Sequence, residues 1–380
     1  MIPLSVPNLS GNEWKYIKEC LDTNWVSAVG SYVDDFEKKF ATFTQSRYAV
    51  SVVNGTAALH ISLLLAGVER GDLVIVPNIT FVASCNAISY VGAEPLLIDV
   101  DPLTWQMDLS LLENFLKEKT VQKNGQLYHK ESQRRIKAIM PVHVLGNMCD
   151  MDQVMKLASD YLLEVVEDST EALGSYYKNK HAGTFGKLGC FSFNGNKIIT
   201  TGGGGMIVTD DEKLGKKAKH ITTQAKAKSD EYFHDEIGYN YRLVNILAAM
   251  GVAQLEQLSG FLERKKQVTD FYNNQLKKIK GIQFQQVNPN VQPNNWLYTV
   301  MIPGQKKLIA YLNQSTIQVR PFWVPMNQLP MFKKNIYITT HDRSDEIYHT
   351  SVSLPCSTSI LDQELEQVVS KIIEFDHVNG

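Results

Sequence analysis

The sequence lacks the features that mark several large classes of protein. Its 380 residues carry a formal net charge of -2, so no basic excess is available to hold nucleic acid or an anionic membrane. The five cysteines form no C-x-x-C pair and no zinc-ligand spacing, which indicates reduced thiols and no metal site. No apolar run approaches the ~20 residues that cross a bilayer, and the first residues do not read as a signal peptide. We therefore expect a cytoplasmic protein without nucleic-acid, membrane or metal partners.

Two common phosphate-binding motifs are also absent. The glycine run Gly202–Gly205 is not part of a G-x-x-x-x-G-K-[ST] motif, which argues against a P-loop. No helix start follows these glycines, as a dinucleotide fingerprint would require. The run instead offers backbone freedom and close approach to a ligand.

What the chain does contain is an alternation of apolar strands with helices over its first two thirds. Such alternation predicts a mainly parallel sheet covered on both faces, with ligands at the carboxyl ends of the strands. The polar segment 117–135 interrupts the pattern and predicts a surface excursion with a small hairpin. A long helical stretch follows, and then a smaller α+β unit. We predict a large α/β domain over residues 1–245 and a small C-terminal α+β domain over residues 246–380.

Lys197 lies in the string GCFSFNGNKIITTGGGGM, between two apolar strand-like segments. A lysine among few compensating charges loses its proton more easily and can form a Schiff base. Taken alone, a lysine of this kind is far more typical of a glycine-rich hairpin with a solvated side chain. The flanking residues, considered below with the other motifs, favour the Schiff-base interpretation.

Asp168 ends an apolar strand in the string VVEDSTEALGS, where α/β proteins place their sites. A carboxylate there could keep the pyridine nitrogen of pyridoxal phosphate protonated. The alternative is that Asp168 or Ser169 caps a following helix.

Two further strings suggest anion binding. In VVNGTAALH a strand ends and a helix begins near Thr56 or Ala57, which would place free N–H groups beside a phosphate. In GYNYRLVNI, Asn240 and Arg242 could reach an anion. An ordinary strand-to-helix turn and a capped helix start explain the two strings equally well.

Together these strings resemble the nucleotide-sugar aminotransferases of the DegT/StrS family. The resemblance runs along nearly the whole chain and includes NGTAALH, PNITFVAS, PVHVLG, EDSTEALGS, FNGNKIITTGGGGM and VRPFWVPMNQLP. It implies the aspartate-aminotransferase fold of pyridoxal-phosphate enzymes (fold type I). It also implies pyridoxal 5'-phosphate as cofactor, L-glutamate as amino donor and a nucleotide-linked keto-sugar as acceptor.

The resemblance assigns expected roles to individual residues. Lys197 would carry the cofactor as a Schiff base and move the proton, and Asp168 would pair with the ring nitrogen. Glu171 stands near the ring hydroxyl, where many relatives have Gln or His. The expected phosphate ligands are Thr56, Ala57 and Ser192. Phe81 matches an aromatic residue that stacks on the cofactor ring.

Four other positions carry weaker expectations. Asn240 matches a phosphate ligand supplied by the neighbouring subunit, which implies a homodimer with shared sites. Arg242 and Arg320 are candidates for binding substrate anions, with surface salt bridges as the alternative. His143, in PVHVLG, is either a substrate-site residue or a packed histidine.

Within the family, the NGNKIITT string and the extra segment 117–135 resemble the subgroup of bacillosamine and legionaminic acid synthesis. The main expectation is therefore amination of carbon 4 of a UDP-linked 4-keto-6-deoxy-N-acetylhexosamine for a bacterial surface glycan such as an O-antigen. One alternative is a perosamine-type 4-aminotransferase that acts on GDP-4-keto-6-deoxymannose. Another is a regulatory relative that binds the cofactor without turnover.

Overall fold

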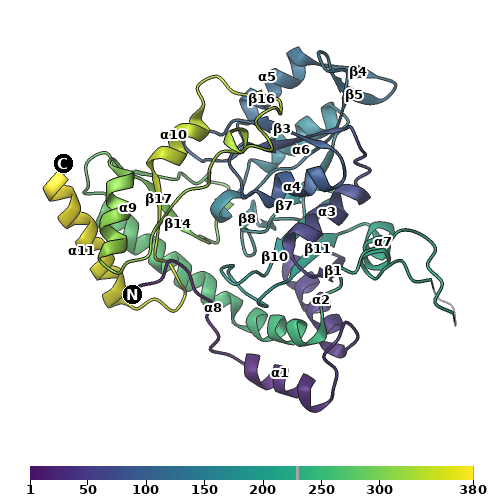
Figure 1. The fold of residues 1–380 in the computed structure, drawn as a ribbon, viewed down its shortest axis with the longest axis horizontal. Coiled ribbons are helices and arrows are strands. Elements are labelled where there is room, and N and C mark those ends of the chain that lie inside the picture. Colours follow the sequence, from purple (N-terminus) through teal and green to yellow (C-terminus); the bar gives the residue numbers. More distant parts are fainter. Residues whose placement is uncertain (228–230, 380) are drawn as a thin grey trace.

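The computed structural model describes residues 1–227 and 231–379, and a ten-stranded mixed sheet forms the centre of its larger part (Figure 1). In order across the sheet the main strands are β1 (Tyr48–Val52), β11 (Gly205–Thr209), β10 (Leu188–Ser192), β7 (Glu164–Asp168), β6 (Arg135–Ile139), β2 (Leu73–Pro77), β3 (Glu94–Ile98) and β16 (Tyr337–Ile338). Along this order all neighbours from β10 to β16 are parallel, and β11 is the one of these eight strands that runs in the opposite direction. The predicted mainly parallel sheet is confirmed.

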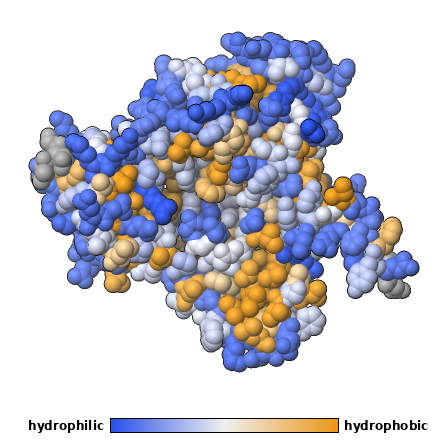
Figure 2. Space-filling view, viewed as in Figure 1, coloured by the Kyte–Doolittle hydropathy of each residue, from blue (hydrophilic) through white to orange (hydrophobic). Residues whose placement is uncertain are grey.

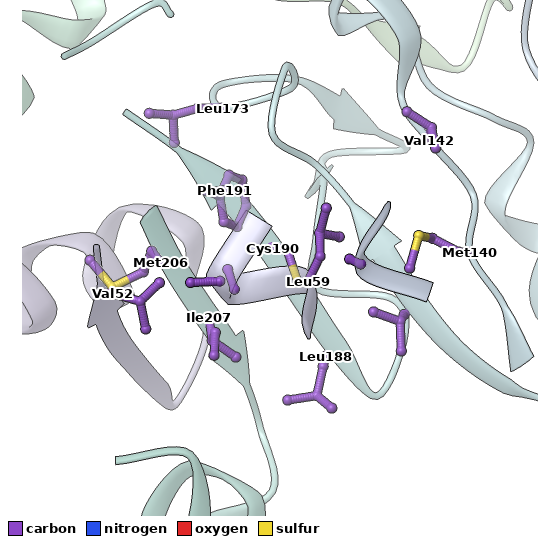
Figure 3. Close-up of a cluster of buried hydrophobic side chains, with 14 of the residues drawn as sticks. Val52, Leu59, Met140, Val142, Leu173, Leu188, Cys190, Phe191, Met206 and Ile207 are labelled. Atoms are coloured by element: carbon purple, nitrogen blue, oxygen red, sulfur yellow. The ribbon is translucent and has the colours of Figure 1, made fainter. Parts of the chain in front are cut away.

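Helices that follow the strands cover both faces of this sheet. They are α3 (Gly55–Leu65), α4 (Ala83–Tyr90), α5 (Leu109–Lys119), α6 (Met151–Asp160) and α7 (Glu212–Thr222). Successive residues of one strand enter two different apolar clusters, with Val74 and Val76 in one and Leu73 and Ile75 in the other. This follows from the two-residue period of a strand, whose side chains alternate between the faces. Figure 3 shows part of the first cluster, with Leu59 of α3 among side chains of β10 and β11.

The segment 117–135 forms the predicted hairpin, with strands β4 (Thr120–Lys123) and β5 (Gln126–His129). β5 also pairs antiparallel with β6, so the hairpin extends the main sheet. A small separate sheet contains β8 (Tyr176–Tyr177), β9 (Lys180–His181) and β13 (Val291–Gln292).

The long helical stretch is one continuous helix, α8 (Asn245–Leu276), against which α1 (Glu13–Asp22) and α2 (Ser31–Thr44) pack. Beyond it a four-stranded sheet has the order β12 (Gln283–Phe284), β14 (Tyr298–Met301), β17 (Ser351–Leu354) and β15 (Arg320–Pro321). β15 is limited to two residues at the edge of this sheet, because its Pro321 cannot donate to a ladder.

The C-terminal part also contains helices α9 (Gln305–Gln314), α10 (Arg343–Thr350) and α11 (Asp362–Asn379), and two short 3-10 helices, Val144–Gly146 and Met326–Gln328, complete the fold. Its apolar cluster lies between its sheet, α9, α11 and the end of α8. However, β16 pairs with β3, and β13 pairs with β8, so residues beyond 245 also complete the sheets of the larger part. The division of the chain at residue 245 remains a prediction. None of the helices within residues 1–227 and 231–379 combines the length and apolar character needed to cross a membrane.

Candidate active site

A cavity of about 740 Å³ opens at the carboxyl ends of the central strands, where the C-terminal part meets the main sheet. Residues from both parts of the chain line it, among them Thr56, Phe81, Ser192, Lys197, Arg320 and Trp323. β1 and β10 run in the same direction because each is antiparallel to β11. The turns after β1, β7 and β10 therefore meet at one edge of the sheet, as expected for a parallel α/β architecture.

Lys197 reaches this cavity from the segment between β10 and β11, with only 12% of its side chain exposed. Its Nζ lies 3.8 Å from Glu171 Oε1 and 3.8 Å from the centroid of the Trp296 ring. Burial lowers the pKa of Lys197, and the carboxylates of Glu171 and Asp168 oppose this shift. A buried amine of lowered pKa is the group required for Schiff-base formation.

Glu171 forms a buried pair with this lysine. Its Oε2 accepts the backbone N–H of Leu145 at 2.8 Å. Burial raises the pKa of Glu171 to about 7, although the charge of Lys197 acts in the opposite direction. Burial thus favours the neutral form of both members of the pair.

Asp168 ends β7 just behind the cavity wall and is 2% exposed. Its Oδ2 accepts the hydroxyl of Ser84 at 2.6 Å, and its Oδ1 accepts the hydroxyl of Thr170 at 2.7 Å and the Thr170 N–H at 3.2 Å. Thr170 itself lines the cavity. All three donors are neutral, so the carboxylate can still accept a hydrogen bond from a cationic ring N–H.

The start of α3 provides a site for an anion at the same cavity. Asn54 caps the helix, because its Oδ1 accepts the N–H of Ala57 at 2.8 Å. Gly55, Thr56 and Ser192 line the cavity beside this helix end, whose partial positive charge favours a phosphate. A Cβ at Gly55 would lie 2.8 Å from the Ser192 Cβ, so this close approach requires glycine. The Ala57 N–H already donates to the Asn54 side chain. Gly55 and Thr56, and not Ala57, line the cavity.

Of the expected residues, Ala57, Asp168 and Glu171 do not line the cavity themselves but neighbour residues that do, and His143, Asn240 and Arg242 also lie outside the lining. His143 is fully buried, with its Nε2 3.1 Å from Glu167 Oε2. Burial disfavours the charged form, but the Cys149 thiol and the Glu167 carboxylate raise the pKa of His143 to about 9. Arg242 bridges to Val52 and Asn240 to Thr223 through their backbones. The geometry of His143 fits the packed alternative.

Several cavity residues were missed by the sequence analysis. Trp296, Phe322 and Trp323 form an aromatic wall, with the rings of Phe322 and Trp323 4.7 Å apart and those of Trp296 and Trp323 6.3 Å apart. Phe322 and Trp323 lie in VRPFWVPMNQLP, one of the strings of the family resemblance, but no role was assigned to them or to Trp296. The only signal available was their aromatic character beside Arg320.

The model of the DegT/DnrJ/EryC1/StrS aminotransferase family matches residues 7–373. The chain belongs to this family. GDP-perosamine synthase of Escherichia coli O157:H7 is 39% identical over 377 residues, covering 98% of both proteins. The namesake from Caulobacter vibrioides is 35% identical over 98% of this chain and 97% of its own length.

The solved structures of sugar aminotransferases share the fold of this family member. CalS13 from Micromonospora echinospora superimposes with a TM-score of 0.87 at 25% identity, covering 98% of this chain and 100% of its own. The expected fold type I architecture is therefore confirmed. The protein is a sugar aminotransferase, and its cofactor is pyridoxal 5'-phosphate.

The residues of the cavity fit this cofactor. A lysine of lowered pKa, a buried carboxylate with only neutral donors and a capped helix start lie around one cavity. These are the partners that an aldehyde, a pyridine nitrogen and a phosphate require.

Proposed function

We propose that this aminotransferase transfers an amino group from L-glutamate to carbon 4 of GDP-4-keto-6-deoxymannose and so forms a perosamine-type sugar nucleotide. The observation that carries this proposal is the 39% identity over nearly the full length to a protein named GDP-perosamine synthase. Two further relatives with the same name, from Caulobacter vibrioides and Vibrio cholerae, support it.

The UDP-sugar expectation loses support on the same grounds. It depended on the NGNKIITT string and on segment 117–135. The cavity lining includes no residue of that segment, whose hairpin pairs with the first residues of β6, at the end of the strand opposite to the cavity. Within this chain the hairpin is therefore not placed to distinguish nucleotides.

The residue roles follow from the site geometry as part of the proposal. When bound, pyridoxal phosphate supplies an aldehyde carbon that carries the amino group and a ring that withdraws electrons. Lys197 would hold the cofactor covalently and, once released, move the proton at the substrate carbon. Asp168 would keep the ring nitrogen protonated. The Glu171 carboxyl, 3.8 Å from the Lys197 Nζ, would hold a proton near the ring hydroxyl.

The remaining roles concern the anionic groups and the ring face. The start of α3, with Thr56 and Ser192, would hold the cofactor phosphate. Phe81, which is 54% exposed and lines the cavity, would stack on the ring. Arg320 is exposed at the cavity and would bind the diphosphate of the sugar nucleotide.

A homodimer with shared sites is part of the proposal. The segment before Asn240 exposes Tyr232, Phe233 and Ile237, which are 91%, 55% and 85% exposed. Figure 2 shows an apolar area beside α1 and the N-terminal half of α8, and the chain next to α1 exposes Trp25 and Val29. Apolar surface of this kind supports contact with a second copy. Asn240 would then reach the phosphate of the partner subunit.

The experiment is a comparison of two acceptors under matched conditions. Purified protein with pyridoxal phosphate and L-glutamate is given GDP-4-keto-6-deoxymannose or UDP-4-keto-6-deoxy-N-acetylglucosamine, and the products are identified by mass spectrometry. We expect the 4-amino product from the GDP-sugar, and none from the Lys197→Ala variant. Amination of the UDP-sugar alone would contradict the proposal.

A further inference from the structure

Trp296, in the C-terminal part of the chain, has its indole ring against the amine of Lys197. It is 3% exposed and lies just before β14. The centroid of its ring is 3.8 Å from Lys197 Nζ, well inside the ~6 Å range of a cation–π contact. Its indole N–H donates to the backbone carbonyl of Asn196 at 2.6 Å. One side chain therefore contacts both the amine of the lysine and the backbone immediately before it.

The position of Trp296 is itself held from behind. Asn294 is 2% exposed, and its side-chain oxygen accepts a hydrogen bond from the backbone N–H of Trp296 at 2.9 Å. The amide nitrogen of the same Asn294 donates to the carbonyl of Glu171 at 2.7 Å. The buried Lys265 donates to the carbonyl of Trp296 at 2.8 Å. Asn294 thus links the backbones of Trp296 and Glu171, the two residues whose side chains contact Lys197.

We propose that Trp296 is a positioning residue for Lys197. Its indole face holds the lysine amine when that amine is free of the cofactor, and its indole N–H fixes the loop that carries the lysine. The inference rests on the proposed role of Lys197 as the cofactor lysine. A free lysine has four rotatable side-chain bonds and would otherwise lose its place at the substrate carbon. Holding it on the ring face keeps Nζ within reach of the carbon that it must deprotonate.

The charged surroundings of Lys197 determine how the contact can be detected. Two carboxyl groups face the amine, Glu171 at 3.8 Å and Asp168 at longer range. Arg320 lines the same cavity, and Lys265 lines a small crevice that Lys197 shares. The ring face favours the charged amine over the neutral amine. Its removal should therefore make Lys197 easier to deprotonate while these four groups stay in place.

The experiment measures how fast cofactor-free protein captures pyridoxal phosphate, followed by the absorbance of the bound cofactor at a series of pH values. Only the neutral amine attacks the aldehyde, so the rate of capture rises with pH to a plateau. The midpoint of this rise is set by the pKa of the Lys197 amine. The ionisations of the cofactor itself are common to all variants. Capture by the Lys197→Ala variant gives the background from other lysines.

Trp296→Leu should lower this midpoint by about half a unit to one unit, because a desolvated cation–π contact of that size is lost. Trp296→Phe keeps a weaker ring and should lower it by roughly a few tenths of a unit. Trp105→Leu is the matched control, since Trp105 is also a buried indole, 1% exposed, in the core beside Phe322. It should leave the midpoint unchanged.

An unchanged midpoint in folded Trp296→Leu overturns the inference, and so does an equal shift in Trp105→Leu. If Trp296→Leu does not fold, the Trp296→Phe midpoint decides in the same way. Failure of the underlying function looks different: the parent would then capture the cofactor no faster than Lys197→Ala, at every pH.

Discussion

At the scale of single residues, the chemistry depends on how burial changes the protonation of a few side chains. Lys197 and Glu171 lie 3.8 Å apart in the interior, and burial lowers the pKa of the amine and raises that of the carboxyl. Both shifts favour the neutral pair, which is the state that the proposed proton transfers require. The sequence indicated Lys197, Asp168 and Glu171 because their local strings carry the family pattern.

The raised pKa of Glu171 predicts a pH-dependent stability. The carboxyl titrates near 7 in the folded protein and near its ordinary value of 4.5 when unfolded. Between these values the folded state binds more protons, so the free energy of unfolding falls as pH rises through this window. In cofactor-free Glu171→Gln this contribution disappears, and the variant should lose less stability than the parent between pH 4.5 and 7. Urea unfolding across the range measures it, and parallel profiles would contradict the assignment.

At the scale of elements, α8 connects the two parts of the chain and carries two glycines in different surroundings. A Cβ at Gly251 would lie 2.8 Å from the ring of Phe36 in α2, whereas nothing lies within 4 Å of one at Gly260. The structure therefore shows close packing at Gly251 and open space at Gly260. Phe36 in turn contacts Phe193, next to β10. The helix is thus packed through α2 against the strand that leads to Lys197.

This difference predicts opposite effects of the same substitution. Gly251→Ala must displace a ring in a packed core and should reduce the free energy of unfolding by about 1–3 kcal/mol. Gly260→Ala improves helix propensity in open space and should increase it by roughly 0.5–1 kcal/mol. Chemical denaturation of both variants measures the two changes. Equal effects would show that the contact with Phe36 does not restrict this position.

At the scale of the whole molecule, Asn240 does not line the cavity of its own chain, as the proposed contribution to a partner site requires. Mixed dimers of Lys197→Ala and Asn240→Ala test this. Each variant alone should be nearly inactive, but random mixing should restore about a quarter of the parental sites, since half of the dimers then contain one intact site. If Asn240 acts within its own subunit, mixing restores nothing. Activity after co-refolding of equal amounts measures the outcome.

The sequence by itself determined the strands, the helices and the local strings that surround the cofactor. Apolar periodicity and short-range turn chemistry act over a few residues, so the elements and the candidates Lys197 and Thr56 could be proposed before the fold was known. The candidates Phe81, Ser192 and Arg320 came from the family resemblance. Only the tertiary structure brought Trp296 onto Lys197, with its N–H bonded 100 residues away in the sequence, and assigned the Ala57 amide to Asn54. The physical reason is that contacts between distant segments depend on how α8 and the two sheets pack together, and no local pattern records that packing.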